Sequence, residues 1–118
     1  MKLKVIDIAG SPVLMSPEKG DKVYERLNRS LSLSDEKIEL DFDGYKLISS
    51  TFLNHAFGQL CIDKKLKVEQ FFNKISFLNL SNEDFDEVKL CIINAQTRLS
   101  LRENGFNENE IYSNLSTF

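Results

Sequence analysis

The chain has 118 residues, which is the size of one ordinary domain and too short for two separate cores. Hydrophobic residues make up 42% and charged residues 28% of the chain, a composition typical of a globular protein rather than a disordered one. The formal net charge is −3, and acidic and basic residues are interleaved without a block of Lys or Arg. A nucleic-acid partner is therefore not expected.

The sequence also argues against secretion and membrane insertion. The N-terminus lacks the apolar stretch of a signal peptide, and no run approaches the roughly 18 apolar residues that a membrane span needs. The cysteines, Cys61 and Cys91, are far apart and fit neither a metal clip nor a disulfide framework. We expect a soluble, cytoplasmic protein without a membrane partner, a metal ion or a cofactor.

The first elements expected are a strand around residues 3–8, a turn over 9–12 and a short strand at 13–15, which together predict an N-terminal hairpin. Ser16 and Pro17 then suit the cap and the first position of a helix. The apolar stripe of that helix has spacings of three and four residues, over Val23, Tyr24, Leu27 and Leu31. Gly20, in its first turn, is either tolerated there or allows a close backbone approach.

The middle of the chain predicts a strand, a turn and a buried helix. Residues 38–42 alternate apolar and acidic side chains, as in a half-buried strand. A turn at 43–44 and a short extended return at 45–48 follow. The hydroxyl residues 49–51 can cap a helix, and residues 52–61 carry apolar side chains at helical spacing.

The C-terminal part predicts one or two helical turns within residues 66–72, a strand at 75–80 and a capping sequence at 81–84. A long helix follows, and Gly105 is a plausible stop. This alternation of strands and helices predicts an α/β fold, with a mixed or mainly parallel sheet and helices packed mainly on one face. Residues 1–104 would form the domain.

Residues 105–118 would form a C-terminal tail, either a short helix or a flexible segment. Self-association stays open as an alternative, because four apolar residues of the tail suit pairing with another chain: Ile111, Tyr112, Leu115 and Phe118.

Catalytic motifs are weak. No Gly-rich phosphate loop occurs, and the single histidine, His55, excludes a His-rich zinc site. Ser50, His55 and Asp41 form a Ser-His-Asp set on paper, but no GxSxG elbow surrounds a serine. A solvated strand end is favoured over a cation site for Asp41 and Asp43. We therefore expect a protein that is not an enzyme.

The clearest candidate site is positional. In open α/β sheets, sites form where strands end and helices begin, and residues 49–51 place three hydroxyls at such a junction. A phosphate added there would be stabilised by the positive end of the helix and would change the local charge by nearly two. The simpler interpretation is that these residues only cap the helix.

Around this junction the sequence resembles the STAS-like family of bacterial and phage domains of unknown function (the DUF4325 type). The motifs that carry the resemblance are Asp41-Phe42-Asp43-Gly44, Ile48-Ser49-Ser50-Thr51-Phe52 and Ala56-Phe57-Gly58. Ser16-Pro17 with Gly20, and residues 77–87, also fit the family, so that the similarity covers most of residues 3–100. The resemblance implies a STAS-like mixed sheet of about four to five strands, helices mainly on one face, and an exposed turn before the second helix.

More distantly, the junction is similar to STAS domains of anti-sigma factor antagonists. In those domains a D-S-S-G step begins a helix, and its second Ser is phosphorylated by a histidine-kinase-like ATPase. The alignment puts Thr51 at the phosphorylated Ser and Ser50 at the first Ser. Two positions depart from the pattern, because Ser49 replaces the Asp and Phe52 replaces the Gly.

The resemblance thus implies a non-catalytic regulatory module that binds a protein partner, such as an ATPase-type kinase, with Ser/Thr phosphorylation as a switch. The residues it points to are Asp43, Ser49, Ser50, Thr51, Phe52 and His55. The alternative is a small-ligand or nucleotide-binding factor, such as a phage or host-defence component. In that case amide groups at the start of the helix near Ser50 would hold the anion.

Overall fold

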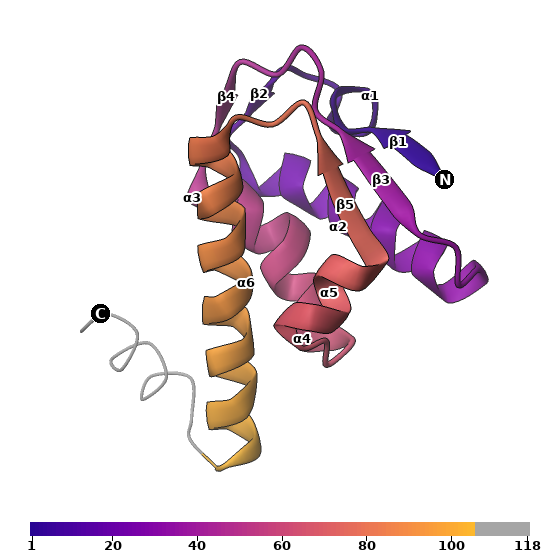
Figure 1. Ribbon diagram of the computed structural model, residues 1–118. Coiled ribbons are helices and arrows are strands. Elements are labelled where there is room, and N and C mark those ends of the chain that lie inside the picture. The colour runs from indigo at the N-terminus through magenta and orange to yellow at the C-terminus, as the bar shows by residue number, and fades with distance from the viewer. Residues whose placement is uncertain (106–118) are drawn as a thin grey trace.

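The computed structural model describes residues 1–105, in which short strands alternate with helices (Figure 1). The strands are β1 (Lys2–Lys4), β2 (Val13–Leu14), β3 (Ile38–Asp41), β4 (Leu47–Ile48) and β5 (Ile75–Leu78). The helices are α1 (Val5–Ala9), α2 (Pro17–Leu33), α3 (Ser50–Leu53), α4 (Gln59–Asp63), α5 (Val68–Lys74) and α6 (Asn82–Glu103), and a π-helical segment, η1 (Asn54–Gly58), joins α3 to α4. Within this described part of the chain, no helix is both long and apolar enough to cross a membrane.

The strands divide between two small parallel sheets. One has the order β1-β3-β5, and the other pairs β2 with β4. The α/β fold and the mainly parallel pairing are thus confirmed. The single mixed sheet of about four to five strands is not confirmed, because β2 and β4 pair with each other instead of joining the larger sheet.

One face of the three-stranded sheet is buried, and the other is more exposed. Leu3, Leu40 and Phe77 stand side by side in the register, and the first two are buried while Phe77 is partly buried against the core. The neighbouring row, in contrast, carries Lys2 and Glu39, which are exposed. Side chains alternate between the faces of a strand, so the sheet packs on the core mainly through one face, although Asp41 on the other face is also buried.

The expected N-terminal hairpin is wrong. Residues 5–9 form the helix α1, which ends at Gly10 with a left-handed φ of 78°. Val5 and Ala9, four residues apart, are both buried, as one face of a helix would be. β2 cannot then fold back on β1, and it pairs in parallel with β4.

Several helix starts and stops are confirmed. Ser16 caps α2, with Pro17 at its first position, and the predicted stripe faces the core. Ser81 caps α6, where its hydroxyl accepts the amide of Asp84 at 3.1 Å. Gly105 follows the end of α6 with a φ of 89°. The predicted tail, apart from Gly105, lies outside the described residues.

The predicted helix over 52–61 exists, but it is divided into α3, η1 and α4 and lies between α2 and α6. α2 approaches α3 closely at Gly20, since a Cβ on this residue would lie 2.6 Å from the carbonyl oxygen of Phe52. A Cβ at Gly58 would lie 3.6 Å from Sγ of Cys91 on α6. Of the two interpretations of Gly20, the close backbone approach is therefore the one observed.

Candidate functional site at the β4–α3 junction

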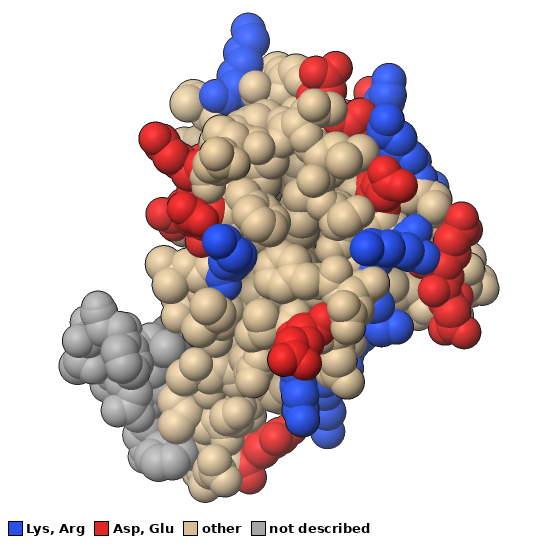
Figure 2. Space-filling model, in the orientation of Figure 1, with Lys and Arg blue, Asp and Glu red and all other residues tan. Residues whose placement is uncertain are grey.

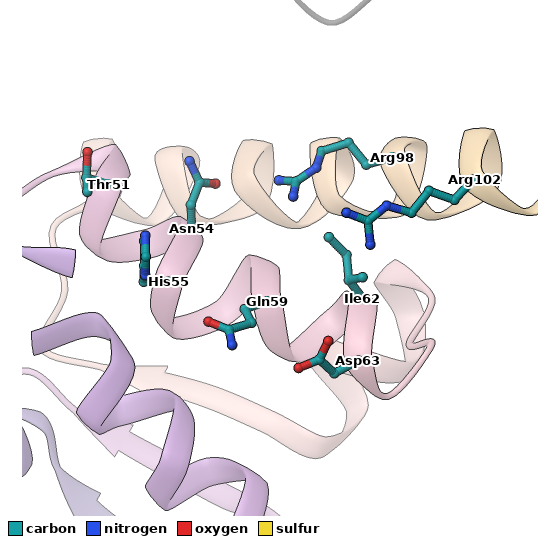
Figure 3. A pocket seen from close by; sticks show the side chains of 8 residues that line it. All are labelled: Thr51, Asn54, His55, Gln59, Ile62, Asp63, Arg98 and Arg102. Atoms are coloured by element: carbon teal, nitrogen blue, oxygen red, sulfur yellow. The ribbon is translucent and has the colours of Figure 1, made fainter. Parts of the chain in front are cut away.

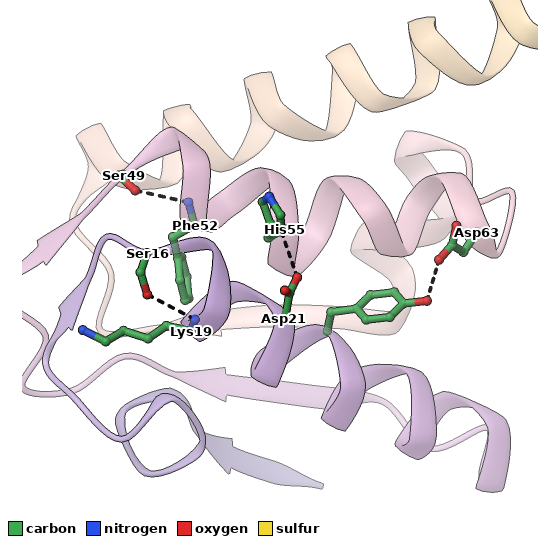
Figure 4. Close-up of polar contacts among 8 residues, drawn as sticks. Ser16, Lys19, Asp21, Ser49, Phe52, His55 and Asp63 are labelled. Atoms are coloured by element: carbon green, nitrogen blue, oxygen red, sulfur yellow. Dashed lines mark hydrogen bonds and ion pairs between the residues drawn. The ribbon is translucent and has the colours of Figure 1, made fainter. Parts of the chain in front are cut away.

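Two similar strand-to-helix junctions lie next to each other. β2 and β4 pair in parallel, and each leads into a helix capped by a serine. Ser16 Oγ accepts the amide of Lys19 at 3.3 Å, and Ser49 Oγ accepts the amide of Phe52 at 3.1 Å (Figure 4). The two helix starts are therefore held side by side by the small sheet.

Ser49 joins the two junctions. Its hydroxyl donates to the carbonyl oxygen of Met15 at 2.9 Å, and its amide donates to the carbonyl oxygen of Leu14 at 3.0 Å. The hydroxyl proton and the oxygen of Ser49 are both engaged in holding the fold. Of the three hydroxyls predicted at this site, Ser49 is the structural one.

Ser50 and Thr51 occupy the first two positions of α3, and both are exposed. They lie beyond the cap, where the free amides of the helix start create a positive potential. Phe52, in contrast, is fully buried. The bulky side chain that replaces Gly in the antagonist pattern thus fills the core and leaves the surface beside Thr51 uncovered.

His55 lies on the same helical segment. It pairs with an acidic residue, Asp21, which the sequence pattern did not predict as its partner. Its Nδ1 lies 2.8 Å from Oδ1 of Asp21 on α2 (Figure 4). Both side chains are near half exposure, at 42% for His55 and 48% for Asp21. Asp21 is 34 residues away in sequence, and only the close packing at Gly20 brings it to His55.

Asp41 and Asp43 lie at the end of β3, and Asp41 serves the fold. Asp41 Oδ1 accepts Nδ2 of Asn79 at 2.8 Å and the amide of Asp43 at 2.9 Å. These hydrogen bonds lower the pKa of Asp41, and the bond from Asn79 has the larger effect. Asp43 itself is exposed, and Gly44 beside it has a φ of 84°. The set of Ser50, His55 and Asp41 is not assembled, since His55 pairs with Asp21.

Two apolar side chains are exposed at the junction. Met15, directly after β2, is 46% exposed, and Leu47, at the start of β4, is 57% exposed. Met15 lies against Ser49 through the hydrogen bond from the serine hydroxyl. We call Met15, Leu47, Ser50 and Thr51 the junction surface. Sequence reasoning missed Met15 and Leu47, because an apolar residue in a short strand is usually assigned to the core.

A groove begins at Thr51 and runs between the helical segment 50–63 and α6. It encloses about 420 Å³ and is lined by Thr51, Asn54, His55, Gln59, Ile62, Asp63, Arg98 and Arg102 (Figure 3). α2 supports its near wall through two polar contacts, Asp21 with His55 and Tyr24 with Asp63. The hydroxyl of Tyr24 donates to Oδ2 of Asp63 at 2.5 Å, which, helped by burial, raises the pKa of Tyr24 to about 12.

Figure 2 shows acidic and basic side chains intermixed around a broad area without charged side chains on this face of the molecule. Within residues 1–105, no group of three His, Cys, Asp or Glu side chains is placed to hold a metal ion.

The comparison with protein families decides the relationship. The model of the STAS-like domain of unknown function (DUF4325) matches residues 19–85, more than half of the chain. The chain belongs to this family. No curated protein and no solved structure matches it. The matched part of this STAS-like domain includes Gly20 and the whole β4–α3 junction, while Ser16 and Pro17 lie outside it.

Proposed function

We propose that this STAS-like domain is a non-catalytic regulatory module that binds a protein partner through the junction surface. The observation that carries the proposal is the exposure of Leu47 and Met15 beside two exposed hydroxyls. Apolar side chains on a polar surface are typical of interaction sites, where they become the buried centre of the interface. The exposed hydroxyls and Asp43 would then lie nearer its rim.

The junction surface is held in place before any partner arrives. Lys46 donates its amide to the carbonyl of Pro12 at 2.8 Å, and Ser49 binds both Leu14 and Met15. These contacts fix the two turns relative to each other. A partner would therefore lose little conformational entropy in ordering them, which favours binding.

Ser50 and Thr51 are the proposed switch. A phosphate on either residue would lie at the start of α3, where free amides stabilise negative charge. It would also place nearly two negative charges next to Leu47 and Met15, which would repel an apolar partner surface. Thr51 aligns with the phosphorylated Ser of the antagonists, so a histidine-kinase-like ATPase is the proposed partner.

The cytoplasm is the proposed compartment. Cys61 and Cys91 are both free and buried, and burial raises the pKa of each thiol to about 12. Thiols of this kind are inert, and unpaired cysteines suit a reducing environment.

The experiment combines binding with phosphate mapping. The purified chain is incubated with histidine-kinase-like ATPases and ATP, and modified residues are located by mass spectrometry. We expect a complex, with phosphate on Thr51 or Ser50 and none on Ser32, an exposed hydroxyl on α2. The matched variants are Thr51→Val, Ser50→Ala and Ser32→Ala. Absence of both a complex and a modification would contradict the proposal.

A further inference from the structure

We propose that residues 107–118 form a helix that packs antiparallel on the outward face of α6. This segment lies outside the described residues, which end at Gly105, two residues after α6. The face that it would cover consists of Leu90, Ile93, Thr97 and Leu101, which we call the outward stripe. The outward stripe shares no residue with the junction surface, so the proposal goes beyond partner binding there.

α6 carries apolar side chains on two opposite faces. One face is buried in the core, through Val88, Cys91, Ile92 and Ala95. At 3.6 residues per turn, the outward stripe lies almost opposite to this buried row. Leu90 is 52% exposed and Ile93 is 48% exposed. A helix that is apolar on more than one side is usually covered on more than one side, so we expect a further element to pack here.

The outward stripe is suited to an apolar helix. The hydroxyl of Thr97 donates to the carbonyl oxygen of Ile93 at 3.0 Å, so burying Thr97 would leave no hydroxyl without a partner. Between Leu90 and Leu101 the one charged residue is Arg98, which extends into the groove on another side of α6 (Figure 3). The area of Figure 2 without charged side chains accordingly extends over much of the lower half of α6.

A hollow beside the outward stripe gives this face a shape. It encloses about 290 Å³ and is lined by Val68, Ile93, Gln96, Thr97, Ser100 and Leu101. Oε1 of Gln96 accepts the amide of Val68 at 2.8 Å, which holds the start of α5 against α6 and fixes the wall of the hollow. The face is therefore formed before anything packs on it.

The sequence after Gly105 has the pattern of an amphipathic helix. Asn107, three residues before Glu110, fits a capping box in front of apolar residues. Ile111, Leu115 and Phe118 follow at spacings of four and three, so they would share one face of the helix. Residues 107–118 would span about 17 Å as a helix, which is also the length of α6 from residue 90 to residue 101.

The end of α6 lets the chain turn back. The amide of Asn104 donates to the carbonyl oxygen of Ser100 at 3.1 Å, and Gly105 has a left-handed φ of 89°. Such a glycine commonly ends a helix and changes the direction of the chain. A helix that begins after Phe106 would be joined to α6 by three residues, a usual length for two antiparallel helices.

The two apolar patterns match in opposite directions. In an antiparallel helix pair, residues at equal distances from the turn face each other, because both helices rise by about 1.5 Å per residue. Three pairs lie at equal distances from Asn104: Leu90 and Phe118 at fourteen residues, Ile93 and Leu115 at eleven, and Thr97 and Ile111 at seven. The short link also gives the segment a high effective concentration at the outward stripe, which favours it over a second copy of the chain.

Disulfide crosslinking of the full chain tests the proposal. Ile93→Cys combined with Leu115→Cys places two thiols at facing positions and leaves the other two pairs intact. The native thiols of Cys61 and Cys91 do not compete, because both are buried and burial raises the pKa of each to about 12. We expect oxidised glutathione to produce a disulfide within one chain, located by mass spectrometry of the digested protein.

Two control pairs give the reference rates. Ile93→Cys with Ser113→Cys places the second thiol on the opposite side of the proposed helix. Ser32→Cys with Leu115→Cys uses an exposed position on α2, which lies across the segment 50–63 from α6. The facing pair should form its disulfide at least ten times faster than either control pair.

Thermal unfolding provides a second measurement without cysteines. Leu115→Asp should lower the Tm by at least about 4 °C, since it removes a buried leucine from the helix pair. Ser113→Asp, at the solvent side of the proposed helix, should leave the Tm unchanged. The proposal is overturned if the facing pair forms no faster than a control pair, if its disulfide joins two chains, or if both aspartate variants have the same Tm. Partner binding at the junction surface is measured separately and can succeed or fail independently.

Discussion

The junctions at Ser16 and Ser49 have the same strand, cap and helix, but different residues follow the cap. In both, a strand of the small sheet ends, a serine caps the helix, and the helix turns toward the core. After Ser16 the chain continues with Pro17 and Glu18, residues that suit the start of a helix. After Ser49 it continues with Ser50 and Thr51, which are exposed and lie past the cap.

This difference separates the hydroxyls that hold the fold from the exposed hydroxyls of the proposed switch. The cap explains Ser16 and Ser49 completely, because each accepts an amide of its own helix. Ser50 and Thr51 take no part in this cap, since they follow it and are exposed. The comparison therefore predicts that Ser49 and Phe52 matter for stability, whereas Leu47, Ser50 and Thr51 matter for binding.

The largest expected effect is at Phe52. Phe52→Ala should lower the free energy of unfolding by about 3–5 kcal/mol, because it removes a fully buried aromatic ring and leaves a cavity. Leu47→Ala, at a position 57% exposed, should change it by less than about 0.5 kcal/mol. Urea unfolding measures both values. Equal losses for the two variants would remove the distinction between the core side and the exposed side of the junction.

The next largest effect is expected at Gly20 and Gly58, two glycines at contacts between helices. Gly20→Ala should cost about 1–3 kcal/mol, since its Cβ would lie 2.6 Å from the carbonyl oxygen of Phe52 and 2.7 Å from Cβ of His55. Gly58→Ala meets its nearest atom at 3.5 Å and should be neutral or stabilising by up to about 1 kcal/mol. Thermal unfolding of both variants compares the two contacts. A tolerated Gly20→Ala would contradict the close approach of α2 to α3.

Periodicity and caps predicted most of the fold. The starts of α2, α3 and α6 were found because Ser16, Ser49 and Ser81 are good caps before apolar stripes. The strand predicted at 3–8 failed because Val5, Ile8 and Ala9 fit a helical turn as well as an extended segment. Local propensity cannot separate these two, and tertiary packing decides.

The site was only partly predictable for a similar reason. The junction follows from the order of the elements, so Ser49, Ser50 and Thr51 could be located. The partner of His55 could not, because Asp21 is distant in sequence and reaches it only through the contact at Gly20. The groove arises from η1 packing beside α6, and no sequence period signals a π-turn.

A smaller effect should separate the caps from the exposed hydroxyls. Ser49→Ala and Ser16→Ala should each cost about 0.5–2 kcal/mol of unfolding free energy, the usual value of a lost cap. Ser50→Ala should stay within about 0.5 kcal/mol, because its side chain is exposed. Chemical denaturation of the three variants gives the ranking. A loss at Ser50 as large as that at Ser49 would assign Ser50 a structural role.

The smallest effect on stability is expected at Asp41 when the pH is lowered. Hydrogen bonds from Asn79 and from the amide of Asp43 lower the pKa of Asp41 in the folded state. The carboxylate of Asp41 therefore stabilises the fold above the unfolded pKa of about 3.9, and this contribution is lost as the pH falls through the lower, folded pKa. Asp41→Asn should flatten the loss of stability in that acidic range. Asp43→Asn, which removes an exposed carboxylate, is the control, and identical acid profiles for Asp41→Asn and the unaltered chain would contradict this role.

The most direct test of partner binding is the affinity of the junction surface for its partner. A photo-crosslinking residue at position 46, which is exposed next to Leu47, identifies the partner, and titration calorimetry with the purified partner then measures the Kd. Leu47→Ala should weaken the Kd at least tenfold, since a buried leucine contributes about 1.5–3 kcal/mol. Leu33→Ala, at an apolar residue 80% exposed near the end of α2, should leave it unchanged. An equal Kd for the two variants would contradict the assignment of this surface.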